Sequence, residues 1–467
     1  MIASKLHFRR LYAFPAVFLL VFTIAVFRYV QKYFVDVNLG QILFFVNTST
    51  KGADTHFVSL FIQHCIITPS LYALAICYLP LLNFWNFKSK IGYTAFISLL
   101  SLFLTVGYIF YKTSPETIKH FFSNESTDFY ERNYTEPLEA EIQIPQKKNL
   151  IILHVESLEE TFENQEFFGQ NLLADLREFE EKNVKFQNFL DGFATDFTQG
   201  SVMALFTGMP VKYHNLVNKF GKENHFFKGY YSLGKILKDN GYTLTSIQGT
   251  DSDFGGMKIF LEDNDFTDRI DANVIKQNYP NHKQIGAWGY TDDIVLEVAK
   301  DKVMQLSSHK PYFLYIQTID THMGHKPSVK KYTGYDNVYY NIIHHTELHI
   351  AEFLKWLQER PDFKDTVVVI IGDHLRMGKD FPMPDERRVY NLFINTPQPL
   401  NVNRTFTQVD LFPTVIEALG GNIKNHRLGI GTSLFSDVPT FSEIYSEEFL
   451  HETLAKRNDL YEKKFMQ

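Results

Sequence analysis

Cysteine is almost absent from this chain of 467 residues. The two cysteines, Cys65 and Cys77, both fall inside one apolar run, so the rest of the chain cannot rely on disulfide bonds and needs a large core. Positive charge is not in excess either, because the formal net charge is −7. The sequence also contains no recognisable RNA- or DNA-binding motif. The composition therefore excludes nucleic acid as a partner.

Hydrophobic residues, by contrast, make up 45% of the chain, and they are unevenly spread. Three long apolar runs occupy residues 11–30, 57–82 and 91–111. Each is long enough for a helix to cross a hydrocarbon core of roughly 30 Å. The first run could instead be a cleaved signal peptide, but it exceeds the usual apolar stretch of roughly 7–15 residues and no A-x-A site follows it. We therefore predict an N-terminal transmembrane domain over residues 1–111.

Cationic side chains indicate the orientation of the predicted spans. They precede the first span and lie in the short loop between the second and third: Lys5, His7, Arg9, Arg10, Lys88 and Lys90. The positive-inside rule places both groups in the cytoplasm, so everything after Tyr111 is expected outside it. Residues 31–55 would then form an outer loop, whose apolar part Asn38–Asn47 is suited to lie along the membrane interface.

The rest of the chain changes character twice. Residues 112–147 are polar and acidic and predict a linker, with a short helix near Glu116–Phe122. From residue 148, short β-rich runs alternate with helical stretches. The predicted strands are Asn149–Val155, Val184–Phe189, Thr243–Gln248, Tyr312–Thr318, Thr366–Ile371 and Val389–Asn395. The predicted helices are Asn171–Lys182, Ser232–Asn240, Asp292–Leu306 and Asn341–Arg360.

This alternation predicts an α/β domain over residues 148–440, with a mostly parallel sheet sandwiched by helices. The tail, residues 441–467, is rich in Glu and Lys and predicts a surface helix. In a parallel sheet, ligands collect at the carboxyl ends of the strands. Glu156, His322 and the pair Asp373–His374 all come at or just after predicted strand ends.

These residue types suit a metal ion. Asp373 and His374 offer a hard oxygen and a borderline nitrogen from adjacent positions, and Glu156 adds a carboxylate. The alternatives are that Glu156 partners a helix N-cap and that Asp373 caps a turn.

Thr198 lies in the segment Gly192–Pro210, where small residues precede a helix-like run at Ser201–Phe206. A hydroxyl at a helix N-terminus is near backbone N–H groups that favour an ionised oxygen and a phosphoryl anion. Thr195 and Ser201 are rival nucleophiles, and an ordinary threonine N-cap is the plainer reading. A metal ligand that is also a nucleophile would point to phosphoryl or sulfuryl transfer.

Two further segments are candidates for substrate contact. His322 follows the strand at Tyr312–Thr318 and could hold or protonate a leaving group, with His325 as a second choice, although loop histidines are more often simply solvated. The glycine-containing stretch Gln248–Met257 follows another strand and could approach a substrate closely. Its Asp251 and Asp253 could instead be helix caps.

Six segments, in this order, resemble the membrane phosphoglycerol transferases, whose catalytic domain is a sulfatase-like domain of the alkaline phosphatase superfamily. They are ESLEETF, FTQGSVMALFTGMP, IQGTDSDFGGMKIFLEDNDF, WGYTDD, TIDTH and GDHLRMG. The resemblance covers roughly residues 149–435 and implies the alkaline phosphatase fold. It also implies a multi-pass protein of the bacterial inner membrane with its catalytic domain in the periplasm.

The resemblance further implies a set of roles. One divalent ion, often Mn²⁺ with Zn²⁺ or Mg²⁺ as alternatives, would be bound by the ligands Glu156, Thr198, Asp373 and His374. Thr198 would be the nucleophile, because its spacing to Gly208-Met209-Pro210 matches that family. The substrate-binding residues would be His322, Gln248, Asp251 and His325. In one relative, His, Trp and Arg contact the glycerol phosphate where this chain has Gln248, Gly255 and Met257, so headgroup specificity stays open.

The implied activity moves phosphoglycerol from phosphatidylglycerol to a periplasmic glycan through a phospho-threonine intermediate. A near alternative is phosphoethanolamine transfer to lipopolysaccharide, although those enzymes usually carry several cysteines in the soluble domain. A sulfatase is disfavoured because no C/S-x-P-x-R segment is present. The alternative from another class is a membrane-anchored headgroup-binding protein without turnover, and the presence of all four ligand residues argues against it.

Overall fold

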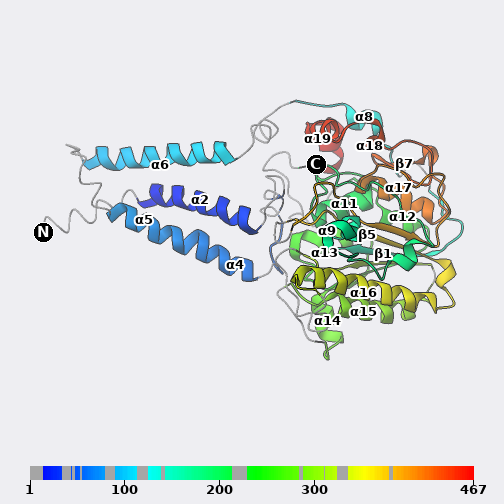
Figure 1. Ribbon diagram of the computed structural model, residues 1–467. Coiled ribbons are helices and arrows are strands. Elements are labelled where there is room, and N and C mark those ends of the chain that lie inside the picture. Colours follow the sequence, from blue (N-terminus) through cyan, green and yellow to red (C-terminus); the bar gives the residue numbers. More distant parts are fainter. Residues whose placement is uncertain are drawn as a thin grey trace. The chain divides into compact units, whose positions relative to one another are not determined.

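The computed structural model divides the chain into two compact units, residues 1–37 with 54–123 and residues 38–53 with 124–467 (Figure 1). The structure describes residues 14–33, 41, 44, 48–52, 55–78, 90–112, 125–137, 142–212, 229–282, 288–309, 311–322, 335–377 and 382–466. We call the unit of residues 1–37 and 54–123 the helical unit, and the unit of residues 38–53 and 124–467 the catalytic unit. The predicted short helix near Glu116–Phe122 lies outside the described residues.

Each of the three apolar runs contains helix. The helical unit holds α2 (Phe14–Tyr33), a continuous helical stretch made of α4 (Thr55–Phe61), η2 (Ile62–Ile67) and α5 (Thr68–Tyr78), and α6 (Lys90–Lys112). Helix α2 packs against both α5 and α6. The two cysteines lie in η2 and α5 and are free thiols.

Length and apolar composition single out one of these stretches. Among the described residues, Val58–Cys77 is long and apolar enough to cross a membrane. The apolar parts of the other two helices, Phe14–Val30 and Ser98–Tyr108, are shorter. Three membrane spans therefore stay a prediction.

The catalytic unit is built on a six-stranded sheet with strand order β3-β2-β4-β1-β5-β6. Its strands are β1 (Asn149–Val155), β2 (Thr243–Gln248), β3 (Asp268–Ile270), β4 (Tyr312–Gln317), β5 (Thr366–Gly372) and β6 (Asn391–Ile394). All neighbours pair in parallel except β5 and β6, which are antiparallel. The predicted α/β class with a mostly parallel sheet is confirmed.

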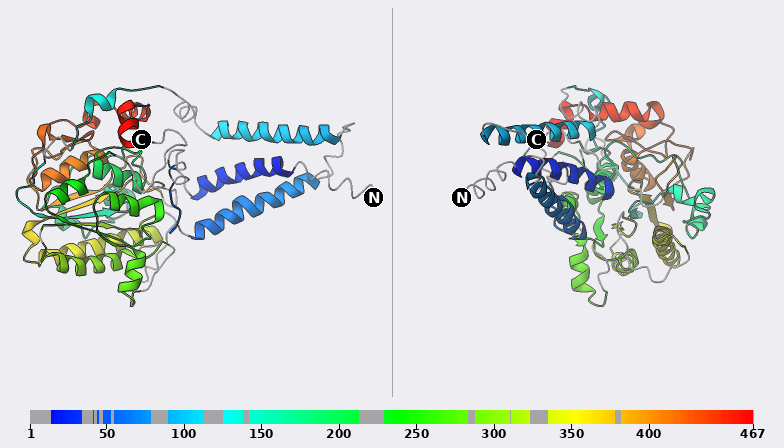
Figure 2. Two further views of the ribbon diagram at one scale, coloured as in Figure 1. Left: turned by 180° about the vertical axis from the view of Figure 1, so that it is seen from behind. Right: turned by 60° about the vertical axis from the view of Figure 1, so that its left-hand side comes forward.

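Helices cover both faces of this sheet (Figures 1 and 2). One face packs against α11 (Thr198–Thr207), α12 (Leu233–Asp239) and α17 (Gln408–Ala418). The other packs against α15 (Asp292–Leu306) and α16 (Val338–Gln358). The two layers correspond to two separate hydrophobic clusters, so the sheet lies between two cores and contributes side chains to both.

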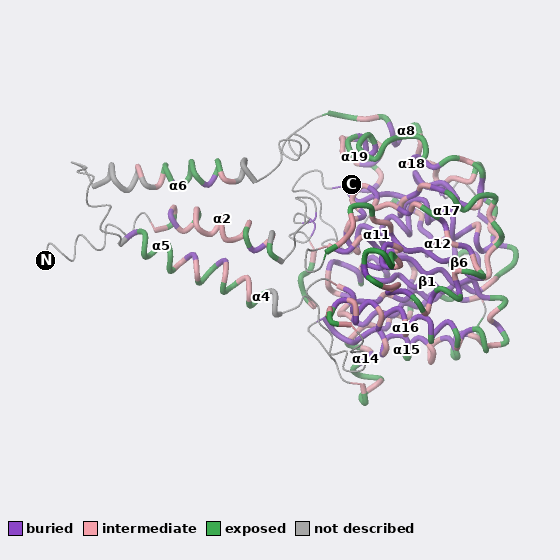
Figure 3. Tube along the Cα trace, viewed as in Figure 1, coloured by how far each residue is buried: buried purple, intermediate pink, exposed green. Residues whose placement is uncertain are grey.

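The central strands are apolar at consecutive positions because both of their faces are buried. In β1, Leu150 and Ile152 face the α11 side, while Ile151 and Leu153 face the α16 side. Every residue of β1 and of β5 is buried, and the strands form the buried centre of the unit in Figure 3.

Two predicted elements are wrong. Residues Val184–Phe189 form only isolated bridges at their two ends, because Asn188 adopts a left-handed φ of 56° that interrupts the extended backbone. In the stretch Asn171–Lys182 the helix spans only Arg177–Glu180, because the Asn171 side chain accepts the Leu173 N–H at 2.7 Å and favours a turn. The short edge strand β3 was not predicted.

Part of the predicted linker belongs to the catalytic unit. Helix α8 (Phe129–Asn133) inserts Phe129 and Tyr130 into the core, and the backbone of Thr135 pairs with Gly429. The boundary between the compact units accordingly falls between residues 123 and 124 rather than at the predicted domain start at 148. Aromatic residues in this polar stretch explain why it packs.

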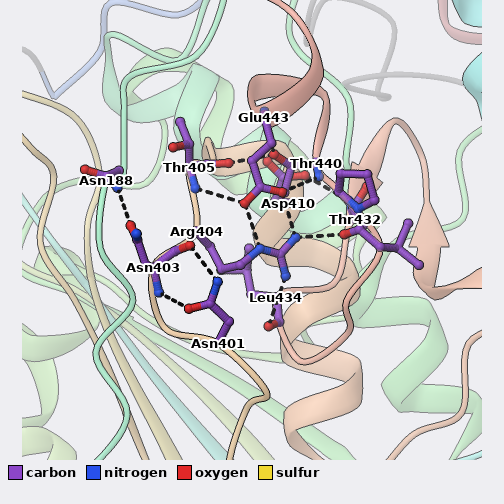
Figure 4. A network of polar contacts seen from close by, with 12 residues as sticks. Asn188, Asn401, Asn403, Arg404, Thr405, Asp410, Thr432, Leu434, Thr440 and Glu443 are labelled. Atoms are coloured by element: carbon purple, nitrogen blue, oxygen red, sulfur yellow. Dashed lines mark hydrogen bonds and ion pairs between the residues drawn. The ribbon is translucent and has the colours of Figure 1, made fainter.

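The tail is also tied to the domain. Thr440 and Glu443 form a capping box at the start of α18 (Phe441–Ile444), followed by α19 (Glu447–Ala455). The buried Arg404 guanidinium donates to both carboxylate oxygens of Glu443 at 2.8 and 3.0 Å (Figure 4). A bidentate pair of this kind fixes orientation as well as charge, so the tail packs as part of the domain surface.

Lys212 is an unusual buried cation. It is 2% exposed, lies over the rings of Tyr130 and Tyr461 at 4.7 and 5.1 Å, and donates to the carbonyl of Lys456. Burial lowers the pKa of its ammonium from 10.5 to about 7, against the opposing carboxylates of Glu462 and Glu131.

We predict that Lys212→Met raises the free energy of unfolding at pH 7 by on the order of 1 kcal/mol. Between pH 7 and 10.5 the unfolded chain binds a proton that the native Lys212 does not, so stability falls as pH decreases through this window. Lys212→Met should lose this dependence of the unfolding free energy on pH. Denaturation at pH 7 and at pH 10 measures both effects, with the exposed Lys238→Met as control. An unchanged pH slope would contradict the assignment.

Candidate active site

The site begins where β1 and β5 end side by side. Val155 pairs with Gly372 in the parallel register, so Glu156 and Asp373 emerge at the same edge of the sheet. The N–H of Asp373 donates to the Val155 carbonyl at 3.1 Å. A Cβ on Gly372 would lie 2.0 Å from the Leu158 carbonyl oxygen, so only glycine allows this close approach.

Glu156, Asp373 and His374 form a buried cluster that could hold a metal ion. Each offers one ligand atom, and these atoms lie within 4.8 Å of one another. His374 Nε2 is 3.7 Å from Glu156 Oε1 and 3.4 Å from Asp373 Oδ2. The Nδ1–H of His374 donates to the Leu375 carbonyl at 2.8 Å, which turns Nε2 toward the carboxylates.

Two atoms of this cluster support the metal interpretation directly. Asp373 Oδ2 and His374 Nε2 are buried and have no hydrogen-bond partner within the described part of the chain. Buried polar atoms normally have partners, and a divalent ion would supply one to both. The mixture of carboxylate oxygen and imidazole nitrogen suits Mn²⁺, Zn²⁺ or Mg²⁺ without selecting among them.

Burial and mutual charge shift the pKa of all three groups. Burial and the neighbouring Glu156 carboxylate raise the pKa of Asp373 to about 7. Burial by itself would lower the pKa of His374, but the two carboxylates outweigh it and raise the pKa to about 9. For Glu156 burial is likewise outweighed, by His322 and His374 and by hydrogen bonds from Ser157 and Thr198, so its pKa is lowered.

Thr198 is the hydroxyl that reaches this cluster. It is the first residue of α11, and its Oγ1 donates to Glu156 Oε2 at 3.3 Å. The rival hydroxyls are engaged elsewhere. Thr195 Oγ1 donates to Gln408 Oε1 at 2.7 Å, and Ser201 Oγ lies 3.0 Å from His154 Nε2.

Thr198 is also not an ordinary N-cap. The N-cap position of α11 is taken by Phe197 in an extended conformation, whose side chain accepts no capping hydrogen bond. The N-terminal end of this ten-residue helix therefore lies at the metal-ligand cluster through Thr198, with the positive end of its dipole directed there.

His322 stands on the turn after β4 and faces the same region. Its ring centroid lies 4.9 Å from that of Trp288, and its charge is among the causes that lower the pKa of Glu156. The preceding Thr321 donates its hydroxyl hydrogen to the Glu156 carbonyl, which attaches this turn to the end of β1. His325 lies outside the described residues.

Gln248 is the last residue of β2 and Asp251 lies on the loop that follows, and each forms a hydrogen bond with a residue two positions further along the chain. The Gln248 amide donates to Thr250 Oγ1 at 2.9 Å, and Asp251 Oδ1 accepts the Asp253 N–H at 2.9 Å. The second bond closes a turn within the loop. The helix-cap alternative is not observed for Asp253, which precedes the short helix η6 (Phe254–Gly256) without a side-chain cap hydrogen bond. Of the predicted site residues, the structure thus brings together Glu156, Thr198, Asp373 and His374, with His322 close by.

A short segment from between α2 and α4 packs against this region. We call its described residues, 41, 44 and 48–52, the rim segment; they belong to the catalytic unit. The Gln41 amide donates to the Asp196 carbonyl at 3.3 Å, and the rings of Phe44 and Phe197 lie 5.4 Å apart edge to face. Gln41 and Phe44 are buried in this packing, and a position of Asn38–Asn47 along a membrane interface stays a prediction.

The other end of the rim segment holds the loop after β2. Gly255 N–H donates to the Ser49 carbonyl at 2.9 Å. The Lys51 ammonium forms an ion pair with Asp253 and lies 4.0 Å from Asp251. The rim segment therefore contacts both the loop before Thr198 and the loop that carries Asp251.

Sequence reasoning missed three supporting residues. Ser157 donates its N–H to Asp373 Oδ1 at 2.7 Å and its hydroxyl hydrogen to Glu156 Oε1 at 2.8 Å, from a left-handed φ of 49°. Buried Arg376 donates to the Thr321 carbonyl, and the Trp288 ring packs against the His322 ring at a tilt of 54°. Arg376 and Trp288 lie in the GDHLRMG and WGYTDD segments, so the family resemblance could have identified them. No sequence pattern marks the positive φ of Ser157.

A family model described as Sulfatase matches residues 148–421. Phosphoglycerol transferase I of Escherichia coli (strain SMS-3-5 / SECEC) is 29% identical over 380 residues, which cover 78% of this chain and 49% of that protein. The Salmonella paratyphi B protein of the same name is 29% identical over 384 residues with the same coverage. The chain spans about half the length of these curated relatives.

Solved structures show the same fold. A protein of the alkaline phosphatase superfamily from Vibrio parahaemolyticus has a TM-score of 0.56 at 21% identity, covering 70% of this chain and 82% of that one. The lipoteichoic acid synthase LtaP from Listeria monocytogenes has a TM-score of 0.52 at 17% identity, covering 68% and 81%. The integral membrane lipooligosaccharide phosphoethanolamine transferase A from Neisseria meningitidis has a TM-score of 0.52 at 14% identity, covering 86% and 83%.

We predict that Ser157→Ala weakens Mn²⁺ binding by roughly 10-fold to 100-fold, because the Ser157 hydroxyl orients the Glu156 carboxylate. The backbone N–H bond to Asp373 persists in the variant. Calorimetric titration of the full-length protein with Mn²⁺ gives the change, and the exposed Ser308→Ala is the control. Equal Mn²⁺ affinity of Ser157→Ala and Ser308→Ala would contradict a role of Ser157 in orienting a metal ligand.

A carbodiimide that joins adjacent amines and carboxylates should link Lys51 to Asp253, because their charged groups form an ion pair. Peptide mass spectrometry of the full-length protein identifies the link. Lys51→Arg keeps the charge but lacks a reactive amine, so the link should disappear in this variant while the rim segment stays in place. Absence of the link in the parent protein would contradict the packing of the rim segment.

Proposed function

The chain belongs to the sulfatase family, and from this membership we propose that it is a membrane-anchored transferase that moves phosphoglycerol from phosphatidylglycerol to a periplasmic glycan. The observation that carries the proposal is the meeting of the Thr198 hydroxyl with Glu156, Asp373 and His374 at one edge of the sheet. The similarity to phosphoglycerol transferase I, at 29% identity over about half of that protein, supports the choice of headgroup.

The first half-reaction is an in-line attack of Thr198 Oγ1 on the lipid phosphorus. The new bond joins threonine to phosphoglycerol, and the bond between phosphorus and the diacylglycerol oxygen breaks. Glu156, Thr198, Asp373 and His374 would hold one divalent ion, for which we propose Mn²⁺ with Zn²⁺ and Mg²⁺ as alternatives. When bound, this ion lowers the pKa of the hydroxyl and neutralises phosphoryl charge. The Thr198 hydroxyl releases its proton to solvent, and diacylglycerol leaves with a proton that His322 supplies.

The second half-reaction reverses the roles. An acceptor hydroxyl attacks the phosphorus and gives its proton to His322, and the bond between the phosphorus and Thr198 Oγ1 breaks. Thr198 then takes back from solvent the proton that its hydroxyl released in the first half-reaction. The backbone N–H groups at the start of α11 donate toward the phosphoryl oxygens in both steps. The low pKa of Glu156 keeps this carboxylate ionised as a ligand throughout.

The remaining predicted residues serve the headgroup in this proposal. Gln248, at the end of β2, and Asp251, on the loop after it, contact the glycerol, and His325 is a further contact. The rim segment fixes this loop through Ser49 and Lys51.

The anchor suits a lipid donor, because the scissile phosphate lies at headgroup level. The helix Val58–Cys77 supports membrane attachment. We propose three spans, the bacterial inner membrane as location and a periplasmic catalytic unit, on the distribution of cations around the apolar runs. Phosphoethanolamine transfer is the second candidate. The absence of cysteine outside η2 and α5 disfavours it.

A lipid-cleavage assay tests the proposal. The full-length protein is incubated with Mn²⁺ and fluorescent phosphatidylglycerol, and in parallel with fluorescent phosphatidylethanolamine. Labelled diacylglycerol should form from phosphatidylglycerol alone. Release from phosphatidylethanolamine alone would establish the other transferase class, and release from neither lipid would contradict both.

Thr198→Ala should reduce diacylglycerol release by at least about 10³-fold, because it removes the nucleophile. Its thermal midpoint should change little, because this partly exposed hydroxyl contributes little to stability. Thr267→Ala, at an exposed threonine, is the matched control and should keep full activity. Full activity in Thr198→Ala would exclude the covalent step through this residue.

A further inference from the structure

A second group of metal-ligating side chains lies between α15 and α16. His345 and His349 are one helical turn apart on α16, and Asp293 is in the first turn of α15. One ligand atom of each lies within 4.8 Å of those of the other two. The two imidazole ring centroids are 4.4 Å apart. The spacing i, i+4 places both rings on the same face of the helix.

The contact of His349 with Glu352 is one that metal-bound histidines typically make. His349 Nδ1 lies 3.0 Å from Glu352 Oε2, one turn further along α16. When Nδ1–H donates to this carboxylate, Nε2 carries the lone pair that a metal ion accepts. The carboxylate also raises the basicity of the imidazole and fixes its ring orientation.

The surroundings of His345 are negatively charged. His345 is buried, and its Nε2 lies 4.0 Å from Asp320 Oδ2. Asp320 and its neighbour Asp292 are both 0% exposed, and Asp320 accepts the Asp292 N–H at 3.0 Å. Placing two buried carboxylates next to Asp293 is unfavourable unless they are protonated or a positive charge compensates them. A bound cation would supply that charge.

We propose that Asp293, His345 and His349 bind a second divalent transition-metal ion, of which Zn²⁺ is the best match. Two imidazoles and one carboxylate are a common zinc ligand set, and the fourth position would be taken by water. The two sites share no ligand, because the first consists of Glu156, Thr198, Asp373 and His374. The binding itself does not depend on the proposed transferase activity.

The position of this ion suggests what it does. Asp292 Oδ1 accepts the N–H groups of Ile319 and Asp320 at 2.8 and 3.2 Å, and Asp292 Oδ2 accepts the Thr346 hydroxyl at 2.8 Å. The start of α15, the middle of α16 and the turn before His322 are therefore already joined. An ion between Asp293 and the two histidines would join α15 directly to α16, and the hydrogen bonds of the adjacent Asp292 would extend this link to the turn before His322.

A neighbouring group on the same helix is a useful contrast. His344 Nδ1 lies 2.9 Å from Glu347 Oε1, and Glu347 Oε1 also accepts the Asp175 N–H at 3.4 Å. This group has a single imidazole, whereas the group of Asp293, His345 and His349 has two. We assign no ion to it.

The test is the metal content of the full-length protein after equilibration with Zn²⁺ and removal of unbound ion, measured by inductively coupled plasma mass spectrometry. The parent protein should retain about two ions per chain, and His349→Gln should retain one fewer. Glu156→Gln should also lose one ion, and the double variant both. The exposed His309→Ala is the matched control and should match the parent protein.

Three results would overturn the proposal: His349→Gln with parental metal content, loss of an ion from His309→Ala, or a parent protein that binds one ion, lost in Glu156→Gln. Because His349 is only partly buried, its variant should fold; His345→Ala gives a second measurement. Addition of Zn²⁺ should raise the thermal midpoint of Glu156→Gln but not that of the double variant. If the second ion does not bind, the outcome of the lipid assay is unaffected. The second metal site and the transferase activity are therefore tested separately.

Discussion

The parallel pairing of β1 with β5 is the interaction on which the candidate site depends. Its register places Val155 opposite Gly372, so Glu156 and Asp373 emerge together at the carboxyl edge. A shift by one residue would turn each side chain to the other face of the sheet. The pairing is secured because both strands are buried on both faces, between the α11 core and the α16 core. The large apolar core therefore determines where the charged cluster forms.

The cluster itself is electrostatically unfavourable without a cation. Two carboxylates and an imidazole are almost fully buried within a few ångströms of one another, and the pKa of Asp373 rises to about 7 in response. Ser157 and Thr198 partly offset this by donating hydrogen bonds, and the positive end of the α11 dipole lies at Thr198. The same pattern recurs around Asp292, Asp320 and His345 on the other side of the sheet. Both groups follow strand ends or helix starts, where backbone N–H groups are available to carboxylates.

The two compact units are interleaved in the sequence. The rim segment comes between α2 and α4 of the helical unit, yet Gln41, Phe44, Ser49 and Lys51 contact the catalytic unit. Residues that hold the loops beside Thr198 are thus encoded between apolar helices. A catalytic domain cut at residue 148 would lack both the rim segment and α8.

Sequence alone determined the α/β class, most of the central strands and the long helices α15 and α16, because continuous apolar runs and helical periodicity reflect burial directly. It also identified the acidic and histidine residues at the ends of β1 and β5. It misjudged Val184–Phe189 and Asn171–Lys182, where a left-handed Asn188 and a side-chain turn at Asn171 override the apolar pattern. Only the tertiary structure decided which hydroxyl reaches the cluster, because Thr195 and Ser201 are bound by Gln408 and His154, which are distant in sequence. It alone also brought Asp293 to His345 and His349, since the packing of two helices, and no local pattern, sets the distance between side chains about fifty residues apart.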